Sequence, residues 1–371
     1  MKRMVFAGFV AAMMLAAGPS QARDYVYGSW VSPKHNVNAM VLPKYFEQVT
    51  KDTNGAIKWK IVAGGQLVDG KGTLPGLRDS LVDAGLQIPI YATSDLPATA
   101  MIFQTLQFNG DPVAATGSSN EFTMLHCPQC LEEFKKTKTV YLGGYAVTPY
   151  HVMCRKEVHD VADLKGLKIR ATGAFVTMLK LTDATPVAMD TATAVEAVQR
   201  GTIDCSLNSM SWLKTYGYQD VTKRVLNQPL GSNQPAIFLF FSRTTWSGFT
   251  ADQRKAHFKH APGATASAAI DAYLKADADI LKEAQAKHGV VLDAPGKGWD
   301  DVIKRYIALQ IEENVKFATA RKVRDPKALL AKYDEAQAKW NRLSKEIGGD
   351  VTKFTAALKR EIYDKIDPNK L

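Results

Sequence analysis

The segment DLKGLKIRATGAFVTMLKLTDATPVAMDTATAVEAVQRGTIDCSLNSM, residues 163–210, carries the pattern that decides the fold. A short apolar strand ends at Arg170, a turn of small residues follows, and a second strand ends at Asn208. The last helical stretch between them ends at Gly201, which suits the left-handed position after a helix. Alternating strands and helices predict a parallel sheet, which binds ligands at the carboxyl ends of its strands. We therefore expect Arg170 and Asn208 to face one ligand cleft, with Arg170 as the anion-binding residue.

Three pieces of this segment resemble the DctP-type solute-binding proteins of tripartite ATP-independent periplasmic (TRAP) transporters. They are LKGLKIR at 164–170, ATPVAM at 184–189 and AVQRGTIDCSLNS at 197–209. The resemblance implies a two-lobed α/β fold like that of periplasmic binding proteins, with mixed sheets flanked by helices and a long interlobe helix. It also implies that Arg170 binds the carboxylate of the ligand and that Asn208 assists.

The chain departs from the family pattern at one position. Many members carry a second basic residue upstream of the carboxylate-binding arginine, whereas twenty positions before Arg170 this sequence has Tyr150, next to His151. Arg155 is nearby, but its spacing from Arg170 does not match the family pattern. Either a tyrosine or histidine donor replaces the second cation, or the ligand has only one carboxylate. The departure argues against a C4-dicarboxylate ligand.

The N-terminus has the layout of a secretory signal. A basic start at residues 1–3 precedes an apolar run over residues 4–17, with small residues at Ser20 and Ala22. The run is short for a membrane span, which needs about 20 apolar residues. We therefore expect export to the periplasm, with the signal peptide cleaved near Ala22.

Composition describes an ordinary soluble globular protein, since 46% of the residues are hydrophobic and 23% are charged. A chain of 371 residues is long for a single hydrophobic core, so two lobes are expected. The net charge of +10 either reflects a solvated basic surface or helps to collect anionic solutes. Because the basic residues form no compact block, no nucleic-acid partner is expected.

The order of the predicted elements divides the chain into five parts. Local patterns predict a loop at residues 110–119, one helix over 121–138, a capped helix start at 250–253 and a long alanine-rich helix over 264–288. Two helices that separate at Gly348-Gly349 are predicted for the C-terminus. The five parts are a signal peptide (1–22), a first lobe (23–148 with 230–262), a second-lobe core (149–229), the long interlobe helix and the following helix (263–325), and C-terminal helices that pack on the lobes (326–371).

Further candidate ligand contacts lie in loops after predicted strands, where binding residues often gather. Polar candidates can hydrogen-bond a ligand and aromatic candidates can form pocket walls. The alternatives are solvent-facing polar groups, ordinary core aromatics and, for Arg170, a salt bridge. Besides Arg170 and Asn208, the candidates are the polar residues His35, Gln66, Tyr150 and Thr172 and the aromatic residues Trp30, Tyr91, Phe175 and Trp212.

These features favour a periplasmic solute-binding protein, without enzyme activity, that captures an organic acid and delivers it to the integral-membrane subunits of a TRAP permease. The motif Cys127-Pro128-Gln129-Cys130 leaves open an exported thiol/disulfide enzyme, although oxidising compartments favour a structural disulfide. A binding protein that feeds a sensor is the other alternative. We expect no cofactor and no metal, because the histidines show no ligand spacing. A monomer is expected, with a dimer as the alternative.

Overall fold

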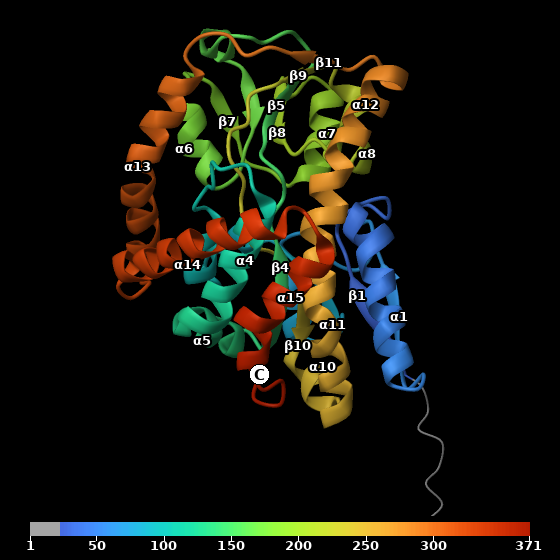
Figure 1. The fold of residues 1–371 in the computed structure, drawn as a ribbon. Helices are drawn as coiled ribbons and strands as arrows, with labels where there is room; N and C mark the ends of the chain where they lie inside the picture. The colour runs from blue at the N-terminus through green and yellow to red at the C-terminus, as the bar shows by residue number, and fades with distance from the viewer. Residues whose placement is uncertain (1–22) are drawn as a thin grey trace, which may run out of the picture.

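The computed structural model describes residues 23–371 and contains two lobes, each built on its own sheet (Figure 1). The predicted signal peptide, residues 1–22, lies outside the described residues. Helices cover both sheets, so the predicted two-lobed α/β class with mixed sheets is confirmed. Among residues 23–371, none of the helices combines the length and the apolar character that crossing a membrane requires.

A five-stranded sheet forms the core of the first lobe. Strands β1 and β3 are parallel neighbours, as are β1 and β2, whereas β10 runs antiparallel between β3 and β4. Every residue of the apolar run in β10 is buried, because helices cover both faces of this part of the sheet. In spatial order the strands are β2 (Ile57–Val62), β1 (Arg23–Gly28), β3 (Ala84–Gln87), β10 (Ala236–Ser242) and β4 (Thr139–Tyr145).

A six-stranded sheet forms the second lobe. The strands that end at Arg170 and Asn208, β6 and β8, are parallel, as the sequence predicted; they are also direct neighbours, and Arg170 lies opposite Ser206. The two strand ends therefore meet at one edge of the sheet. In spatial order the strands are β11 (Val291–Asp293), β9 (Arg224–Leu226), β5 (His151–Cys154), β8 (Cys205–Asn208), β6 (Lys168–Arg170) and β7 (Thr185–Val187).

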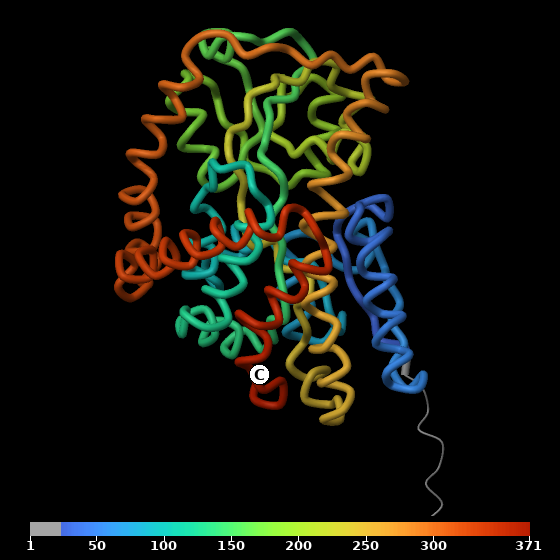
Figure 2. Tube along the Cα trace, viewed as in Figure 1, coloured from blue at the N-terminus to red at the C-terminus, as the bar shows by residue number. Residues whose placement is uncertain are grey.

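Short helices pack on both sheets (Figure 2). Those between the strands of the first lobe are η1 (Val37–Val41), α1 (Leu42–Asp52), α2 (Thr73–Arg78), η2 (Pro89–Tyr91), α3 (Pro97–Phe103), α4 (Pro112–Glu121), η3 (Phe122–His126), α5 (Pro128–Lys136) and α10 (Arg243–Gly248). Those of the second lobe are η4 (Val161–Leu164), α6 (Ala174–Lys180), α7 (Thr191–Gln199), α8 (Trp212–Thr215) and α9 (Tyr218–Val221).

Two local predictions are wrong around residues 110–138. The expected loop at 110–119 is helix α4, whose N-terminus is capped by the carboxylate of Asp111. Its small residues serve close packing rather than flexibility, because a Cβ atom at Gly117 would lie 2.1 Å from the ring of Trp340. The single helix expected over 121–138 is interrupted at Cys127, whose non-helical backbone and sulfur cap the start of α5.

One long helix joins the two lobes and consists of α11 (Ala251–Ala269), η5 (Ile270–Lys275) and α12 (Ala276–His288). Thr250 and Gln253 form the capping box at its start, which confirms the predicted capped start. The predicted first residue of the long helix, 264, is therefore wrong, because the helix continues through Pro262 without ending.

The segment η5 is a π-helical turn, and it lies where the long helix passes from one lobe to the other. Helix α11 packs on α1 and β4 of the first lobe, whereas α12 packs on α8 and α9 of the second. Within the turn, the carbonyl oxygen of Ala272 accepts a hydrogen bond from Asn36 Nδ2 at 2.6 Å. The next residue, Tyr273, is buried with its ring stacked on Tyr145 at 5.4 Å. The π turn thus places a helical tyrosine between the lobes.

The C-terminal part returns to the first lobe. Helix α13 (Trp299–Thr319) contacts α6 of the second lobe and α3 of the first. Helices α14 (Pro326–Ile347) and α15 (Val351–Glu361) pack on α4 and α11 and are followed by the short turn η6 (Tyr363–Lys365). The predicted separation of α14 and α15 at Gly348-Gly349 is confirmed, since both glycines have positive φ angles that suit a helix end.

The four cysteines form two buried disulfides. Cys127 and Cys130 join at the start of α5, three positions apart in sequence. Cys154 and Cys205 face each other across β5 and β8 and are 51 positions apart. The second disulfide therefore closes a long loop that contains the strand carrying Arg170.

Replacing Cys154 and Cys205 together by serine should destabilise the protein more than replacing Cys127 and Cys130. In the chain-entropy description, the disulfide that closes the long loop contributes ~4 kcal/mol to the free energy of unfolding, and the disulfide that closes the short loop contributes ~2 kcal/mol. Urea denaturation of the two double variants measures both losses. Equal losses, or a larger loss for the short loop, would contradict this entropic account.

Asp277, at the start of α12, predicts a pH dependence of stability. Its carboxylate accepts a hydrogen bond from Ser211 N at 2.8 Å in the second lobe, and burial raises its pKa from 3.8 to about 6. The folded protein therefore keeps a proton on Asp277 that the unfolded chain has released, so the contribution of Asp277 to stability should fall as pH rises from 3.8 to about 6. In urea denaturation series across this range, the stability of the wild type relative to Asp277→Asn should therefore fall as pH rises. Asp279→Asn, an exposed position on the same helix, is the control and should keep the wild-type slope.

Candidate functional site

A small enclosed chamber lies between the two lobes, beside the end of β6. Its volume is about 30 Å³, which is room for one or two water molecules. Aromatic side chains dominate the wall and come from both lobes and from the long helix. The aromatic residues are Trp30, Tyr91, Phe103, Tyr145, Tyr150, Trp212, Tyr216 and Tyr273, and the other lining residues are Val31, His35, Leu86, Ile88, Val147, Arg170, Thr172, Thr191, Asn233 and Ala236.

Arg170 is the last residue of β6, and its side chain is 2% exposed. Its Nε donates to the carbonyl oxygen of Met189 at 3.0 Å, and Nη1 donates to that of Leu207 at 3.3 Å. Its Nη2 donates to Thr191 Oγ1 at 3.0 Å and to the Tyr91 hydroxyl at 3.4 Å. These bonds use four of the five guanidinium N–H groups, so one N–H of Nη1 remains for another acceptor.

No acidic side chain neutralises Arg170 within the described part of the chain, since all four of its partners are neutral oxygens. The lining residues of the chamber include no aspartate, glutamate or lysine. Burial lowers the pKa of His35 to about 3, so this imidazole is neutral near pH 7. The chamber therefore holds a single buried positive charge, and a buried charge is costly until an opposite charge pairs with it.

Tyr150 lies next to Arg170 in the chamber wall. Its ring stacks on Phe175 with centroids 4.8 Å apart and meets the edge of Trp212 at 5.1 Å. Burial raises the pKa of Tyr150, so its hydroxyl keeps its proton. Within residues 23–371 this hydroxyl has no hydrogen-bond partner, which leaves it as a second donor beside the guanidinium.

The Tyr273 hydroxyl connects both lobes across the chamber. Trp212 Nε1 of the second lobe donates to it at 3.2 Å, and His35 Nε2 of the first lobe lies 3.1 Å away. Since the backbone N–H of Val37 points at His35 Nδ1 at 3.4 Å, the imidazole proton is assigned to Nε2, which then donates to Tyr273. The π turn in the long helix thus gives the first and second lobes a common hydrogen-bond acceptor.

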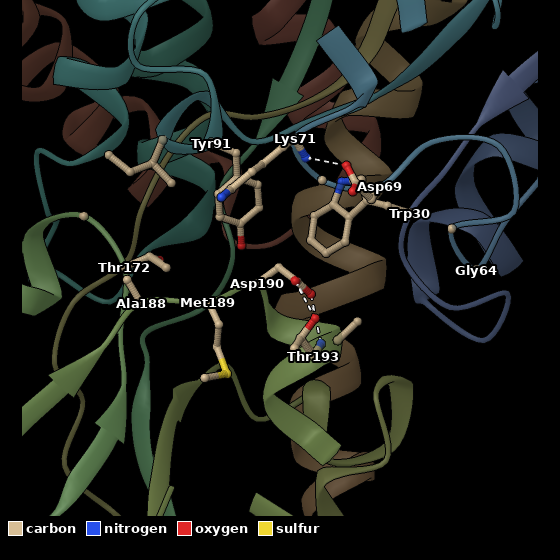
Figure 3. Close-up of a pocket in the computed structure, with 15 residues that line it drawn as sticks. Trp30, Gly64, Asp69, Lys71, Tyr91, Thr172, Ala188, Met189, Asp190 and Thr193 are labelled. Atoms are coloured by element: carbon tan, nitrogen blue, oxygen red, sulfur yellow. Dashed lines mark hydrogen bonds between the residues drawn. The ribbon is translucent and has the colours of Figure 1, made fainter. Parts of the chain in front are cut away.

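A wider cleft of about 660 Å³ lies outside the chamber (Figure 3). Trp30, Tyr91 and Thr172 line both spaces, and the Trp30 and Tyr91 rings meet edge to face at 5.8 Å. The Trp30 indole is held by a hydrogen bond from Nε1 to the carbonyl oxygen of Leu86 at 3.1 Å. These residues form the boundary that a solute must pass between the cleft and the chamber.

Charged and polar side chains surround the outer cleft. Lys71 and Asp69 come from the first lobe, whereas Asp190 and Thr193 come from the second (Figure 3). Asp190 caps helix α7, because its carboxylate accepts from Thr193 N at 2.9 Å and from Thr193 Oγ1 at 2.6 Å. The outer cleft therefore carries acidic side chains and a lysine, which the aromatic chamber behind it lacks.

The structure brings together most of the residues that the sequence selected. Asn208 is fully buried behind the chamber, and its Oδ1 accepts from Ser206 Oγ at 3.0 Å, while Phe175 supports Tyr150 from outside the lining. Gln66 is exposed and faces a different hollow, because left-handed Gly64 and Gly65 turn the loop after β2 away. The predicted residues that do line the chamber are Trp30, His35, Tyr91, Tyr150, Arg170, Thr172 and Trp212.

Sequence reasoning missed several lining residues. Tyr273 lies in the long alanine-rich helix, where an isolated tyrosine gives no sign of a π turn. Asn233 lies between β9 and β10, where the chain crosses between the lobes for the second time. This segment pairs with the segment of the first crossing, because Tyr150 N donates a hydrogen bond to the carbonyl oxygen of Gly231 at 2.8 Å. The sequence signal that could have identified these residues was an aromatic or amide residue close to a point where the chain is predicted to cross between the lobes. The other missed polar or aromatic residues are Phe103, Tyr145, Thr191 and Tyr216.

The structure gives the redox alternative no accessible sulfur, because both Cys127 and Cys130 are fully buried in their disulfide. Thiol–disulfide exchange requires direct attack on a sulfur atom. A cluster of Glu157, His159 and Asp293 has the proximity of a metal site. The guanidinium of Arg224 already pairs with Glu157 at 2.9 Å and with Asp293, so these carboxylates have a cationic partner.

Known proteins resemble this chain over most of its length. Residues 27–310 match the family described as bacterial extracellular solute-binding protein, family 7 (DctP). A TRAP solute-binding protein from Rhodoferax ferrireducens T118, in complex with copurified benzoate, has a TM-score of 0.75 at 22% identity, covering 86% of this chain and 99% of that one.

Two further solved structures share the fold. A TRAP solute-binding protein from a marine metagenome, specific for aromatic acid ligands and in complex with metahydroxyphenylacetate, has a TM-score of 0.74 at 19% identity, covering 85% of this chain and 99% of that one. A TRAP periplasmic solute-binding protein from Bordetella bronchiseptica, with bound mandelate, has a TM-score of 0.71 at 20% identity, covering 86% of this chain and 99% of that one. The chain therefore belongs to family 7 of the bacterial extracellular solute-binding proteins, the DctP family.

Proposed function

We propose that this protein is the periplasmic receptor of a TRAP transporter and binds an organic acid with one carboxylate and a ring-sized, largely apolar body. The observation that carries the proposal is the buried guanidinium of Arg170, which has only neutral partners in an aromatic chamber between the lobes. A carboxylate would pair with this charge through the free N–H of Nη1 and the hydroxyl of Tyr150. Such charge-assisted bonds are shorter and stronger than neutral ones.

The walls of the chamber support an aromatic ligand class. Flat aromatic side chains from both lobes offer stacking and edge contacts to a ring. The structural relatives named above include proteins in complex with benzoate, metahydroxyphenylacetate and mandelate, which are all aromatic monocarboxylates. The likeness of this chain to them supports the same ligand class, and the single cation of the chamber matches a single carboxylate.

Ligand binding must be coupled to movement of the lobes. A chamber of about 30 Å³ is far below the roughly 300 Å³ or more of a typical ligand pocket. Arg170 of the second lobe contacts Tyr91 of the first at 3.4 Å, so the lobes touch across the site. We propose that the lobes separate, that the acid enters past Trp30 and Tyr91, and that closure excludes water around the ion pair.

The downstream partner is proposed to be a pair of integral-membrane permease subunits, which receive the ligand from the closed receptor. Export with cleavage near Ala22, the monomeric state and the lobe boundaries at residues 148 and 230 are proposed on the sequence arguments alone. Delivery to a sensor has no separate support in the residues of the chamber.

Replacing Arg170 by alanine should weaken binding of a carboxylate at least tenfold, because a charge-assisted hydrogen bond is worth about 1.5–3 kcal/mol. Arg170→Lys should recover only part of the affinity, since an ammonium lacks the planar fork of guanidinium. Isothermal calorimetry with benzoate, phenylacetate and mandelate measures both effects. Arg155→Ala is the matched control, because it removes an exposed arginine from the same lobe. Near-normal affinity of Arg170→Ala would contradict the assignment.

Aromatic acids with one carboxylate should raise the melting temperature, whereas those with two should not. A bound ligand stabilises the folded state in proportion to its occupancy. A second carboxylate in the chamber would be buried without a cation, which is strongly unfavourable. A thermal-shift comparison of benzoate with phthalate and terephthalate tests this difference. An equal or larger shift with either dicarboxylate would show that a second cationic site exists.

A further inference from the structure

Asn233 is a buried polar residue at the chamber that the binding of a carboxylate does not use. It lies between β9 and β10 and is 3% exposed. Its side chain lines the same chamber as Arg170. A buried amide normally has all of its hydrogen-bonding capacity matched, so the partners of Asn233 decide what it does there.

The orientation of this amide is determined by its neighbour. Asn233 Nδ2 donates to the carbonyl oxygen of Phe103 at 3.1 Å. Rotating the amide by half a turn would place its oxygen against that carbonyl oxygen, where two acceptors would repel each other. The oxygen Oδ1 is therefore the atom that remains for another partner.

Asn233 Oδ1 has no hydrogen-bond partner among the described residues. Several other buried polar atoms of residues 23–371 share this property, but Asn233 is the one among them whose residue lines the chamber. An amide oxygen accepts hydrogen bonds and cannot donate them. The missing partner must therefore carry a donor, and the chamber that Asn233 lines is the space from which a ligand could supply one.

We propose that Asn233 recognises a hydroxyl group on the ligand, so that the protein selects hydroxylated aromatic acids over their unsubstituted parents. This inference rests on the proposed function, because it requires an acid in the chamber. The donors Arg170 and Tyr150 then serve the carboxylate, and the acceptor Asn233 Oδ1 serves the hydroxyl proton. The site distinguishes the two ends of the ligand because one end of the site donates hydrogen bonds and the other end accepts one.

Asn233 also determines how strongly the site should prefer a hydroxylated acid over its unsubstituted parent. A ligand without a hydroxyl group would leave Oδ1 buried and unpaired, as it is in this structure. Sites built to bond a hydroxyl reject the analogue that lacks it for this reason. A preference of about tenfold or more is expected for the isomer whose hydroxyl reaches Asn233.

Calorimetry with two series of acids tests the proposal. The first compares benzoate with its ortho, meta and para hydroxy derivatives, and the second compares phenylacetate with mandelate. The wild-type protein should bind at least one hydroxylated acid about tenfold more tightly than its parent. Asn233→Leu, which keeps the size of the side chain and removes the acceptor, should abolish this preference.

Gln234→Leu provides the matched control. Gln234 is the next residue, is fully buried, and also has an unpartnered side-chain oxygen, but it does not line the chamber. Its Nε2 donates to the carbonyl oxygen of Thr105 at 2.9 Å, as Asn233 does to Phe103. Gln234→Leu should therefore lower the melting temperature and leave the hydroxyl preference unchanged.

The outcomes separate this inference from the proposed function. If the wild type binds parent and hydroxylated acids equally, Asn233 Oδ1 does not recognise the ligand and the inference is wrong. A preference that survives in Asn233→Leu overturns it as well. If no aromatic acid binds the wild type, the proposed ligand class fails and the inference fails with it. The wild-type comparison needs no variant, so a misfolded Asn233→Leu protein leaves the proposal testable, and Asn233→Ala then replaces it.

Discussion

The site depends on one interaction, the binding of a buried guanidinium by neutral oxygen atoms. Carbonyl oxygens of Met189 and Leu207 hold Arg170 in place, and Thr191 adds a hydroxyl. These dipoles make burial of the charge tolerable without cancelling it. An internal carboxylate would have stabilised the empty protein more, but it would also have competed with an acidic ligand for the same N–H groups. The proposed binding of an acid therefore rests on this unpaired charge.

The geometry of the two sheets explains why this charge lies between the lobes. β6 and β8 are parallel neighbours, so their carboxyl ends share the edge of the sheet that faces the first lobe. The Cys154–Cys205 disulfide cross-links the amino-terminal end of β8 to the carboxyl end of β5 in the same sheet. The second lobe presents Arg170 and the first lobe presents Tyr91. This arrangement suits ligand binding by hinge closure of the two lobes.

Contacts across the chamber come from aromatic hydroxyl and ring N–H groups rather than from ion pairs. Tyr273 receives hydrogen bonds from Trp212 of the second lobe and His35 of the first. Neutral contacts of this kind are worth about 0.5–1.5 kcal/mol each, so they can form and break as the lobes move. Because burial keeps His35 neutral near pH 7, Arg170 has no competing cation inside the chamber.

The sequence alone determined the fold class, the strands that end at Arg170 and Asn208, and seven of the residues that line the chamber. These features follow from strand and helix periodicity and from the rule that parallel strands end at a common edge. Tertiary structure decided the rest. It placed Gln66 on an outer loop, put Asn208 behind the wall, and brought Tyr273 and Asn233 into the chamber. The physical reason is that a π turn in a long helix and the pairing of two distant chain crossings depend on packing between lobes, which leaves no periodic pattern in the sequence.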